Sequence, residues 1–214
     1  MTNQLRDTKE NNPEEYWNIL THGVGIVLSL IGLAVLLSKC NLGETDLKFA
    51  SVLLFGSSSV FVYMASTFYH YNWNKPFRSI YRTLDHITIF YLIAGSYSPF
   101  LLITFNEDVG WRMFIIIWIM AFAGTIFKLF FTGKFETFSL IFYISMGWTV
   151  LLEYNEFVAT TPENTFNLLV IGGILYCIGI VFYRMNKMKF NHTIWHLFVI
   201  FANLFHFCAV YSIL

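Results

Sequence analysis

The chain has 214 residues, of which 57% are hydrophobic, 20% are aromatic and only 12% are charged. Soluble domains carry about a quarter charged residues, so the excess of apolar side chains must face lipid rather than water. Thirteen basic and thirteen acidic residues cancel, which leaves no electrostatic surface for a nucleic acid partner. The composition predicts an integral membrane protein, which we expect in the plasma (inner) membrane.

Seven windows of the sequence are apolar enough for membrane-spanning helices, which need about 20 mostly apolar residues. They are too long and too continuously apolar for the alternating strands of a membrane β-barrel. A polar segment, residues 1–18, precedes them, and residues 19–214 form one transmembrane domain. We expect an all-α bundle of seven transmembrane helices, of which the fifth is the weakest, over approximately Ile19–Ser38, Leu47–Tyr69, Leu84–Thr104, Trp111–Phe131, Thr137–Glu153, Thr165–Tyr183 and His192–Leu214.

Basic residues predict how this bundle is oriented. Ten of the 13 lysines and arginines fall in the N-terminal segment and around the loops after the second, fourth and sixth helices. The other three, Lys39, Lys48 and Arg112, fall on the opposite side. Because loops rich in lysine and arginine stay in the cytoplasm, we expect a cytoplasmic N-terminus and an extracellular C-terminus. This orientation is opposite to that of G-protein-coupled receptors.

Ionisable residues at membrane depth are costly to bury, and they mark candidate functional sites. In the predicted topology His70 ends the second helix, Asp85 begins the third, and His192 and His196 begin the seventh. All four side chains are therefore expected at the same cytoplasmic end of the bundle. His192 and His196 share one helix face because they are four residues apart, and Ser66 stands in the same relation to His70.

Three imidazoles suit a zinc ion, and three protein ligands with one open position are typical of a catalytic site. A carboxylate such as Asp85 can orient an imidazole, take a proton from water or bind the metal itself. Two plainer interpretations stay open. The histidines can be interfacial residues that reach the lipid headgroups, and Asp85 can form an ion pair with Arg82 within its own helix.

The remaining histidines are given no ligand role. His206 lies ten residues after His196, too far along the helix to share its metal, and we expect it to hydrogen-bond a neighbouring helix. We interpret His86 as a packing or supporting residue and His22 as an anchor at the membrane interface.

The residues that carry these features resemble the hemolysin III branch of the PAQR family, whose members include the adiponectin and membrane progestin receptors. The resemblance covers essentially the whole chain, through WNILTHGVG in the first helix, STFYH at Ser66–His70, RTLDHITIFYLIAGSYSPF in the third and HTIWHLFVIFANLFHF in the seventh. It implies a zinc ion bound by His70, His192 and His196, with Ser66 and Asp85 close to a water on the metal. It also suggests kinship with the alkaline ceramidases, which are membrane zinc amidases.

Three functions follow from these observations. The first is a zinc-dependent intramembrane hydrolase of a lipid amide or ester, in which Asp85 accepts a proton from water and Ser66 hydrogen-bonds the water or the developing oxyanion. The second is a pore-forming, hemolytic protein, which needs a polar stripe through the whole membrane. The third is a zinc-stabilised sensor or regulator of membrane lipids without catalytic activity. Membrane lipid and a zinc ion are the expected partners, and the sequence leaves the oligomeric state open.

Overall fold

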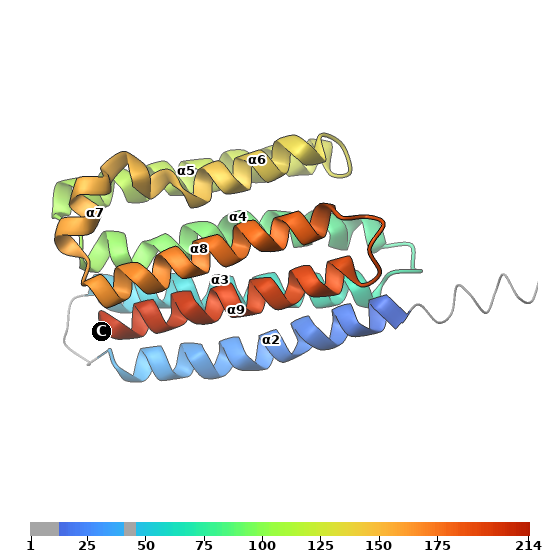
Figure 1. Ribbon diagram of the computed structural model, residues 1–214, viewed down its shortest axis with the longest axis horizontal. Helices are drawn as coiled ribbons and strands as arrows, with labels where there is room; N and C mark the ends of the chain where they lie inside the picture. Colours follow the sequence, from blue (N-terminus) through green and yellow to red (C-terminus); the bar gives the residue numbers. More distant parts are fainter. Residues whose placement is uncertain (1–12, 41–45) are drawn as a thin grey trace, which may run out of the picture.

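The computed structural model describes residues 13–40 and 46–214, and within these ranges all the regular structure is helical. The described residues contain seven segments long and apolar enough to cross a membrane, which confirms the predicted bundle (Figure 1). Six are single helices: α2 (Pro13–Ser38), α3 (Asp46–Tyr71), α4 (Arg78–Ile103), α5 (Glu107–Phe131), α8 (Glu163–Arg184) and α9 (Asn191–Ser212). The other consists of α6 (Glu136–Gly147), a 3₁₀ turn η1 (Thr149–Glu153) and α7 (Tyr154–Thr160).

The broken span corresponds to the weakest of the predicted windows. A break inside a membrane frees backbone polar groups that lipid cannot satisfy, so the protein must supply partners. Tyr97 of α4 does this, because its hydroxyl donates to the Gly147 carbonyl at 2.7 Å and accepts from the Val150 amide at 3.1 Å. One side chain therefore satisfies backbone groups on both sides of the break.

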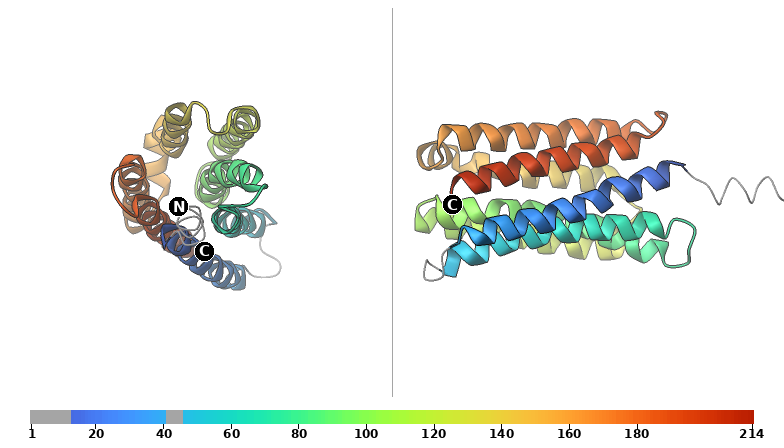
Figure 2. Two further views of the ribbon diagram at one scale, coloured as in Figure 1. Left: turned by 90° about the vertical axis from the view of Figure 1, so that its right-hand side faces the viewer. Right: turned by 90° about the horizontal axis from the view of Figure 1, so that it is seen from below.

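The helices form a ring when they are viewed along their axes (Figure 2). α2 packs against α3 and α9, α4 packs against α3 and α5, and α8 packs against α9. The start of α2, the α3–α4 loop and the α8–α9 loop all lie at one end of the bundle, which we call the histidine end (Figure 1). The end of α9 lies at the opposite end, as a chain with seven crossings requires.

α2 shows how the bundle separates polar from apolar side chains. Its buried face carries the polar residues Glu15, Asn18, His22 and Ser29. Its exposed face is apolar and includes Val24, Val27, Leu28, Leu30 and Ile31. This pattern is the inverse of a soluble amphipathic helix, because lipid solvates the apolar side chains while neighbouring helices supply partners for the polar ones.

The largest buried apolar cluster lies between α4, α5 and the span that follows α5, and Phe90 of α4 is fully buried in it. Gly124 of α5 allows this packing, because a Cβ atom there would lie only 2.5 Å from the Phe90 ring. The close approach of α4 and α5 therefore depends on a glycine at this position.

We expect Gly124→Ala to lower the free energy of unfolding by about 1–3 kcal/mol, because the Phe90 ring must leave its place to admit the methyl group. Gly23→Ala is the matched control, because a Cβ atom at Gly23 meets nothing within 4 Å. Unfolding in detergent micelles measures both variants against the wild type. Equal destabilisation by the two substitutions would contradict this account of the α4–α5 contact.

Candidate metal centre and the cavity beside it

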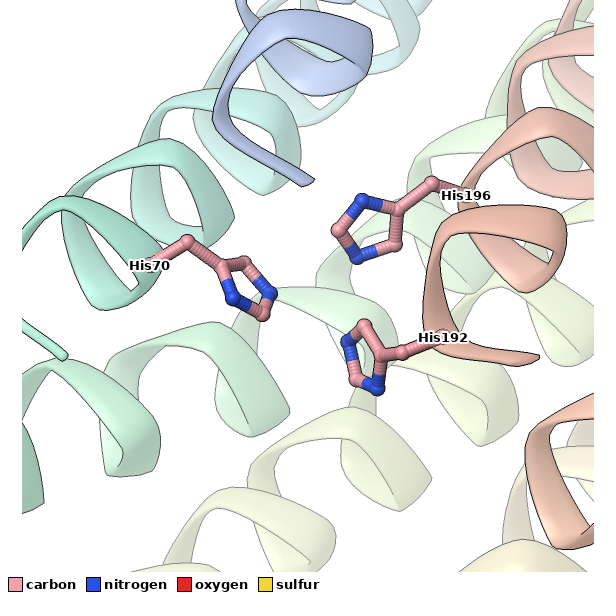
Figure 3. Close-up of side chains that lie close together, drawn as sticks. All are labelled: His70, His192 and His196. Atoms are coloured by element: carbon pink, nitrogen blue, oxygen red, sulfur yellow. The ribbon is translucent and has the colours of Figure 1, made fainter. Parts of the chain in front are cut away.

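Three histidines converge at the histidine end of the bundle. His70 comes from the last turn of α3, and His192 and His196 come from the first two turns of α9. The distances between their ring centroids are 4.9 Å for His70–His192, 5.0 Å for His70–His196 and 4.7 Å for His192–His196. One nitrogen from each ring lies within 4.8 Å of the others, and the rings point toward the space between them (Figure 3). We call these residues the histidine triangle, and it could hold a metal ion.

Glu15 of α2 determines how His70 is presented to this space. Its Oε2 atom lies 2.6 Å from His70 Nδ1, and because a carboxylate accepts, the imidazole nitrogen must donate. The proton is thereby held on Nδ1, and the lone pair of the neutral ring is on Nε2. His70 Nε2 is buried and has no hydrogen-bond partner among the described residues, so it is available to a metal ion.

Thr21 of α2 fixes the position of the ring proton of His196 in a similar way. The Thr21 hydroxyl donates its proton to the Trp17 carbonyl at 2.8 Å. It lies 3.2 Å from His196 Nδ1 and must therefore accept from that nitrogen. The lone pair of His196 is again on Nε2. Two of the three imidazoles are thus held by α2 in the tautomer that a metal ligand needs.

Asp85 and Ser66 lie next to the histidine triangle. Asp85 is 8% exposed and Ser66 is 1% exposed. Asp85 is a neighbour of the Ser66 hydroxyl and the His70 ring, although it is outside the group of candidate metal ligands. Arg82 forms an ion pair with Glu136 of α6 at 3.2 Å. The alternative that the sequence left open, an ion pair of Arg82 with Asp85 within α4, is therefore not the pair observed.

A second polar cluster lies on the α6 side of Asp85. Lys128 of α5 is fully buried, and its ammonium group lies 3.2 Å from Glu136 Oε2. Arg82 contacts the other oxygen of Glu136, and His86 Nδ1 lies 3.9 Å from Oε2. Because a buried charge needs a partner, this carboxylate stabilises the buried Lys128 ammonium group, and it also pairs with Arg82, whose side chain is 39% exposed. Lys128, which the sequence placed near a cytoplasmic loop, is therefore an interior residue.

A cavity of about 130 Å³ extends from the histidine triangle into the bundle. Ser66, Asp85, His192 and His196 line one end of it, and its walls farther in come mainly from apolar side chains of α4, α6, α8 and α9. A second cavity of about 100 Å³ continues toward the opposite end of the bundle. The histidine triangle and Asp85 therefore lie at one end of a long interior space whose walls are mainly apolar.

The burial of the histidines excludes one interpretation that the sequence left open and corrects one expectation. His70 and His196 are buried to 3% and 1% exposure, so they are not interfacial residues that reach lipid headgroups. His22 is also buried, and its ring stacks on His196 with a centroid distance of 3.5 Å. The interpretation of His22 as an interfacial anchor was therefore wrong, because α2 turns its polar face inward.

Sequence reasoning missed Glu15 and Thr21, the two residues of α2 that orient the histidines. Glu15 was included in a polar segment before the first window, whereas α2 begins at Pro13 and includes it. A signal was present, because Glu15, Asn18 and His22 follow one another at spacings of three and four residues, as one face of a helix does. Continuing the first helix back to Pro13 would have revealed this polar face.

The fold and the site define a class of protein: a seven-helix membrane protein with a buried triangle of histidines beside an apolar cavity. The chain matches the family model described as "Haemolysin-III related" over residues 10–207. It is 36% identical to Hemolysin-3 of Bacillus cereus over 100% of this chain and 98% of the relative. It is 32% identical to the human Monocyte to macrophage differentiation factor over 92% of this chain and 83% of the relative. No solved structure matches it.

The chain therefore belongs to the haemolysin III-related family, within the PAQR superfamily, as its helix motifs predicted. It is an integral, multi-pass membrane protein.

Proposed function

We propose that this protein is a zinc-dependent hydrolase that cuts an amide or ester bond of a membrane lipid. One observation carries the proposal: three imidazoles converge beside a buried carboxylate, at the end of a cavity with apolar walls. The triangle offers the ligands, Asp85 offers a base, and the cavity offers space for hydrocarbon.

The residues of the triangle fit a zinc ion. Neutral imidazole nitrogens are preferred zinc ligands, and three of them leave a fourth position open, as in catalytic sites. The unpartnered Nε2 atom of His70 supports this assignment, because a buried polar atom without a partner is costly unless a ligand occupies it. A zinc ion held there would supply Lewis acidity, which polarises a carbonyl group and lowers the pKa of water toward about 7.

The side chains around the triangle supply the proton transfers that hydrolysis needs. The Asp85 carboxylate accepts a proton from the attacking water as the new carbon–oxygen bond forms. It then gives that proton to the departing nitrogen or oxygen as the old bond breaks, so that an acid and an amine or alcohol leave. The Ser66 hydroxyl, next to Asp85, donates a hydrogen bond to the developing oxyanion.

The position and the lining of the site favour a lipid substrate. Amide and ester groups of membrane lipids lie near the interface, and the histidine triangle lies at one end of the bundle (Figure 1). The apolar walls behind it match hydrocarbon better than a water-soluble chain. The same walls argue against a pore, because an aqueous pore needs polar groups throughout its length.

We expect the purified wild-type protein to contain about one zinc ion per chain and His196→Ala to contain almost none, because two imidazoles bind zinc far more weakly than three. His86→Gln is the matched control, since it removes a buried histidine that lies outside the triangle. Elemental analysis of the purified proteins measures the metal. Equal zinc in wild type and His196→Ala would contradict the assignment.

Glu15→Gln is expected to weaken zinc binding by about 10–100-fold while the fold persists, because a neutral amide no longer holds the His70 proton on Nδ1 as firmly. Arg78→Gln is the control, because it breaks the other ion pair of Glu15, at 3.1 Å, and leaves the Glu15–His70 hydrogen bond in place. Competition with a chromophoric chelator measures the affinities. Identical affinities for Glu15→Gln and the wild type would show that the carboxylate has no role at the metal.

Asp85→Asn is expected to lower lipid hydrolysis by about 10²–10⁴-fold and to leave the zinc content unchanged, since an amide cannot accept the proton of water. The assay is the release of fatty acid from a panel of N-acyl and ester lipids by protein in lipid nanodiscs. Asp108→Asn, an exposed residue at the other end of the bundle, is the control and should keep full activity.

The same panel separates the alternative functions. A wild-type protein that holds zinc but hydrolyses none of these lipids would point to a zinc-stabilised sensor or regulator. Release of a dye from liposomes that His192→Ala leaves unchanged would point to a pore that is independent of the site.

A further inference from the structure

The two cavities meet about half-way along the bundle, and side chains from four helices form the boundary between them. Six residues line both cavities: Ser96, Tyr97, Gly147, Trp148, Gly173 and His206. His206 of α9 is ten residues beyond His196, which places it about 15 Å along the helix from the histidine triangle. It is thus an ionisable residue deep in the bundle, away from the candidate metal centre.

The polar side chains at this boundary differ in whether the protein satisfies them. Ser96 donates to the Ile93 carbonyl at 2.8 Å, and the Tyr97 hydroxyl bonds both sides of the break in the fifth span. Trp148 Nε1 donates to Cys177 Sγ at 3.4 Å. By contrast, His206 Nδ1 is buried and has no hydrogen-bond partner among the described residues.

A second unsatisfied group lies beside it. The hydroxyl of Tyr176, on α8, is also buried without a partner, and Tyr176 lines the cavity that begins at the histidine triangle. The Tyr176 and His206 rings meet edge to face, with centroids 5.6 Å apart. Two side chains that contact each other, each with an unpartnered polar atom, thus line the cavity where most of the surrounding wall is apolar.

α8 is shaped to receive the His206 ring at this position. A Cβ atom on Gly172 would lie 2.4 Å from His206 Cδ2 and 2.6 Å from Nε2, so any other residue there would displace the ring. The glycine allows the imidazole to lie directly against the α8 backbone, close to Tyr176. The pairing of these two side chains is therefore built into the packing of α8 against α9.

Burying a polar group without a partner costs about 1–3 kcal/mol, and the two groups together are costly unless a ligand satisfies them. A hydroxyl group suits both, because it donates to a ring nitrogen and accepts from a tyrosine O–H at the same time. We propose that His206 and Tyr176 form a subsite for a hydroxyl group carried part-way along the hydrocarbon chain of a lipid in the cavity.

The distance indicates where along the chain that hydroxyl lies. A lipid whose carboxyl-derived end is at the histidine triangle reaches His206 after about 15 Å, which is roughly 12 bonds of an extended hydrocarbon chain. The placement of the carboxyl-derived end at the histidine triangle rests on the proposed function. The observation that His206 and Tyr176 lack hydrogen-bond partners does not depend on it. The ligand class is therefore a lipid with a mid-chain hydroxyl rather than one with a plain saturated chain.

The test is the binding of free fatty acids to the purified, zinc-loaded protein, measured by displacement of a fluorescent fatty acid. The ligands are octadecanoic acid and its monohydroxy forms with the hydroxyl near the carboxyl group, in mid-chain or at the methyl end. We expect the mid-chain form to bind about 5–30-fold more tightly than octadecanoic acid, as one or two buried hydrogen bonds provide. Free acids have no bond for a hydrolase to cut, so the result does not depend on turnover.

Tyr176→Phe keeps the ring and removes the hydroxyl, and it should reduce this preference to near parity. His206→Phe should do the same, and thermal unfolding verifies that each variant is folded. Tyr211→Phe is the matched control, because it removes the hydroxyl of an exposed tyrosine that lines neither cavity. It should keep the preference.

Equal binding of all the acids to the wild type would overturn the subsite. An unchanged preference in Tyr176→Phe would also overturn it. A preference for the mid-chain hydroxyl in a protein that hydrolyses no lipid would leave the subsite standing and refute the proposed reaction alone.

Discussion

One buried carboxylate connects three helices at the end of the bundle where the histidines converge. Glu15 of α2 accepts a hydrogen bond from His70 of α3 and pairs with Arg78 at the start of α4. A charge at this depth is costly unless it is paired, and the two contacts, each to a different carboxylate oxygen, join the three helices. Asn18, one turn further along α2, adds a contact of 3.4 Å to the same nitrogen of His70. The presentation of the histidine triangle depends on this arrangement.

The rest of the site follows from the same constraint, that polar groups inside a membrane protein need partners from the protein. Thr21 satisfies His196 Nδ1, and Asn18 accepts from the Thr193 hydroxyl at 2.6 Å. Lys128 and Glu136 satisfy each other beside Asp85. Several buried polar atoms of the described residues remain unsatisfied, and three of them bear on function. They are His70 Nε2 in the histidine triangle, and His206 Nδ1 and the Tyr176 hydroxyl on two side chains that line the cavity.

The break in the fifth span also leaves polar groups that need partners from the protein. A continuous helix needs no outside partners, whereas the turn after Gly147 needs the hydroxyl of Tyr97. That contact fastens the broken span to α4, and both cavities lie against it. A hydrolase with a lipid substrate requires such an interior, polar at one end for the reacting group and apolar beyond it for the chain. The bundle combines these surfaces because apolar residues face lipid on the outside and also line most of the interior.

The sequence by itself determined the seven helices, since runs of apolar residues of spanning length have few alternatives in a membrane. It also indicated that His70, His192, His196, Asp85 and Ser66 gather at one end, because an odd or even number of crossings decides the side of each helix terminus. It could not show which residues complete the site.

Three contacts at the site join different helices. They are the ion pair of Arg82 with Glu136, the hydrogen bond of His70 to Glu15 and the stacking of His22 on His196. Such contacts depend on how each helix is rotated about its own axis, which hydropathy does not specify. Only the packing of the helices decided those rotations, because it must turn each polar group toward a partner and away from lipid.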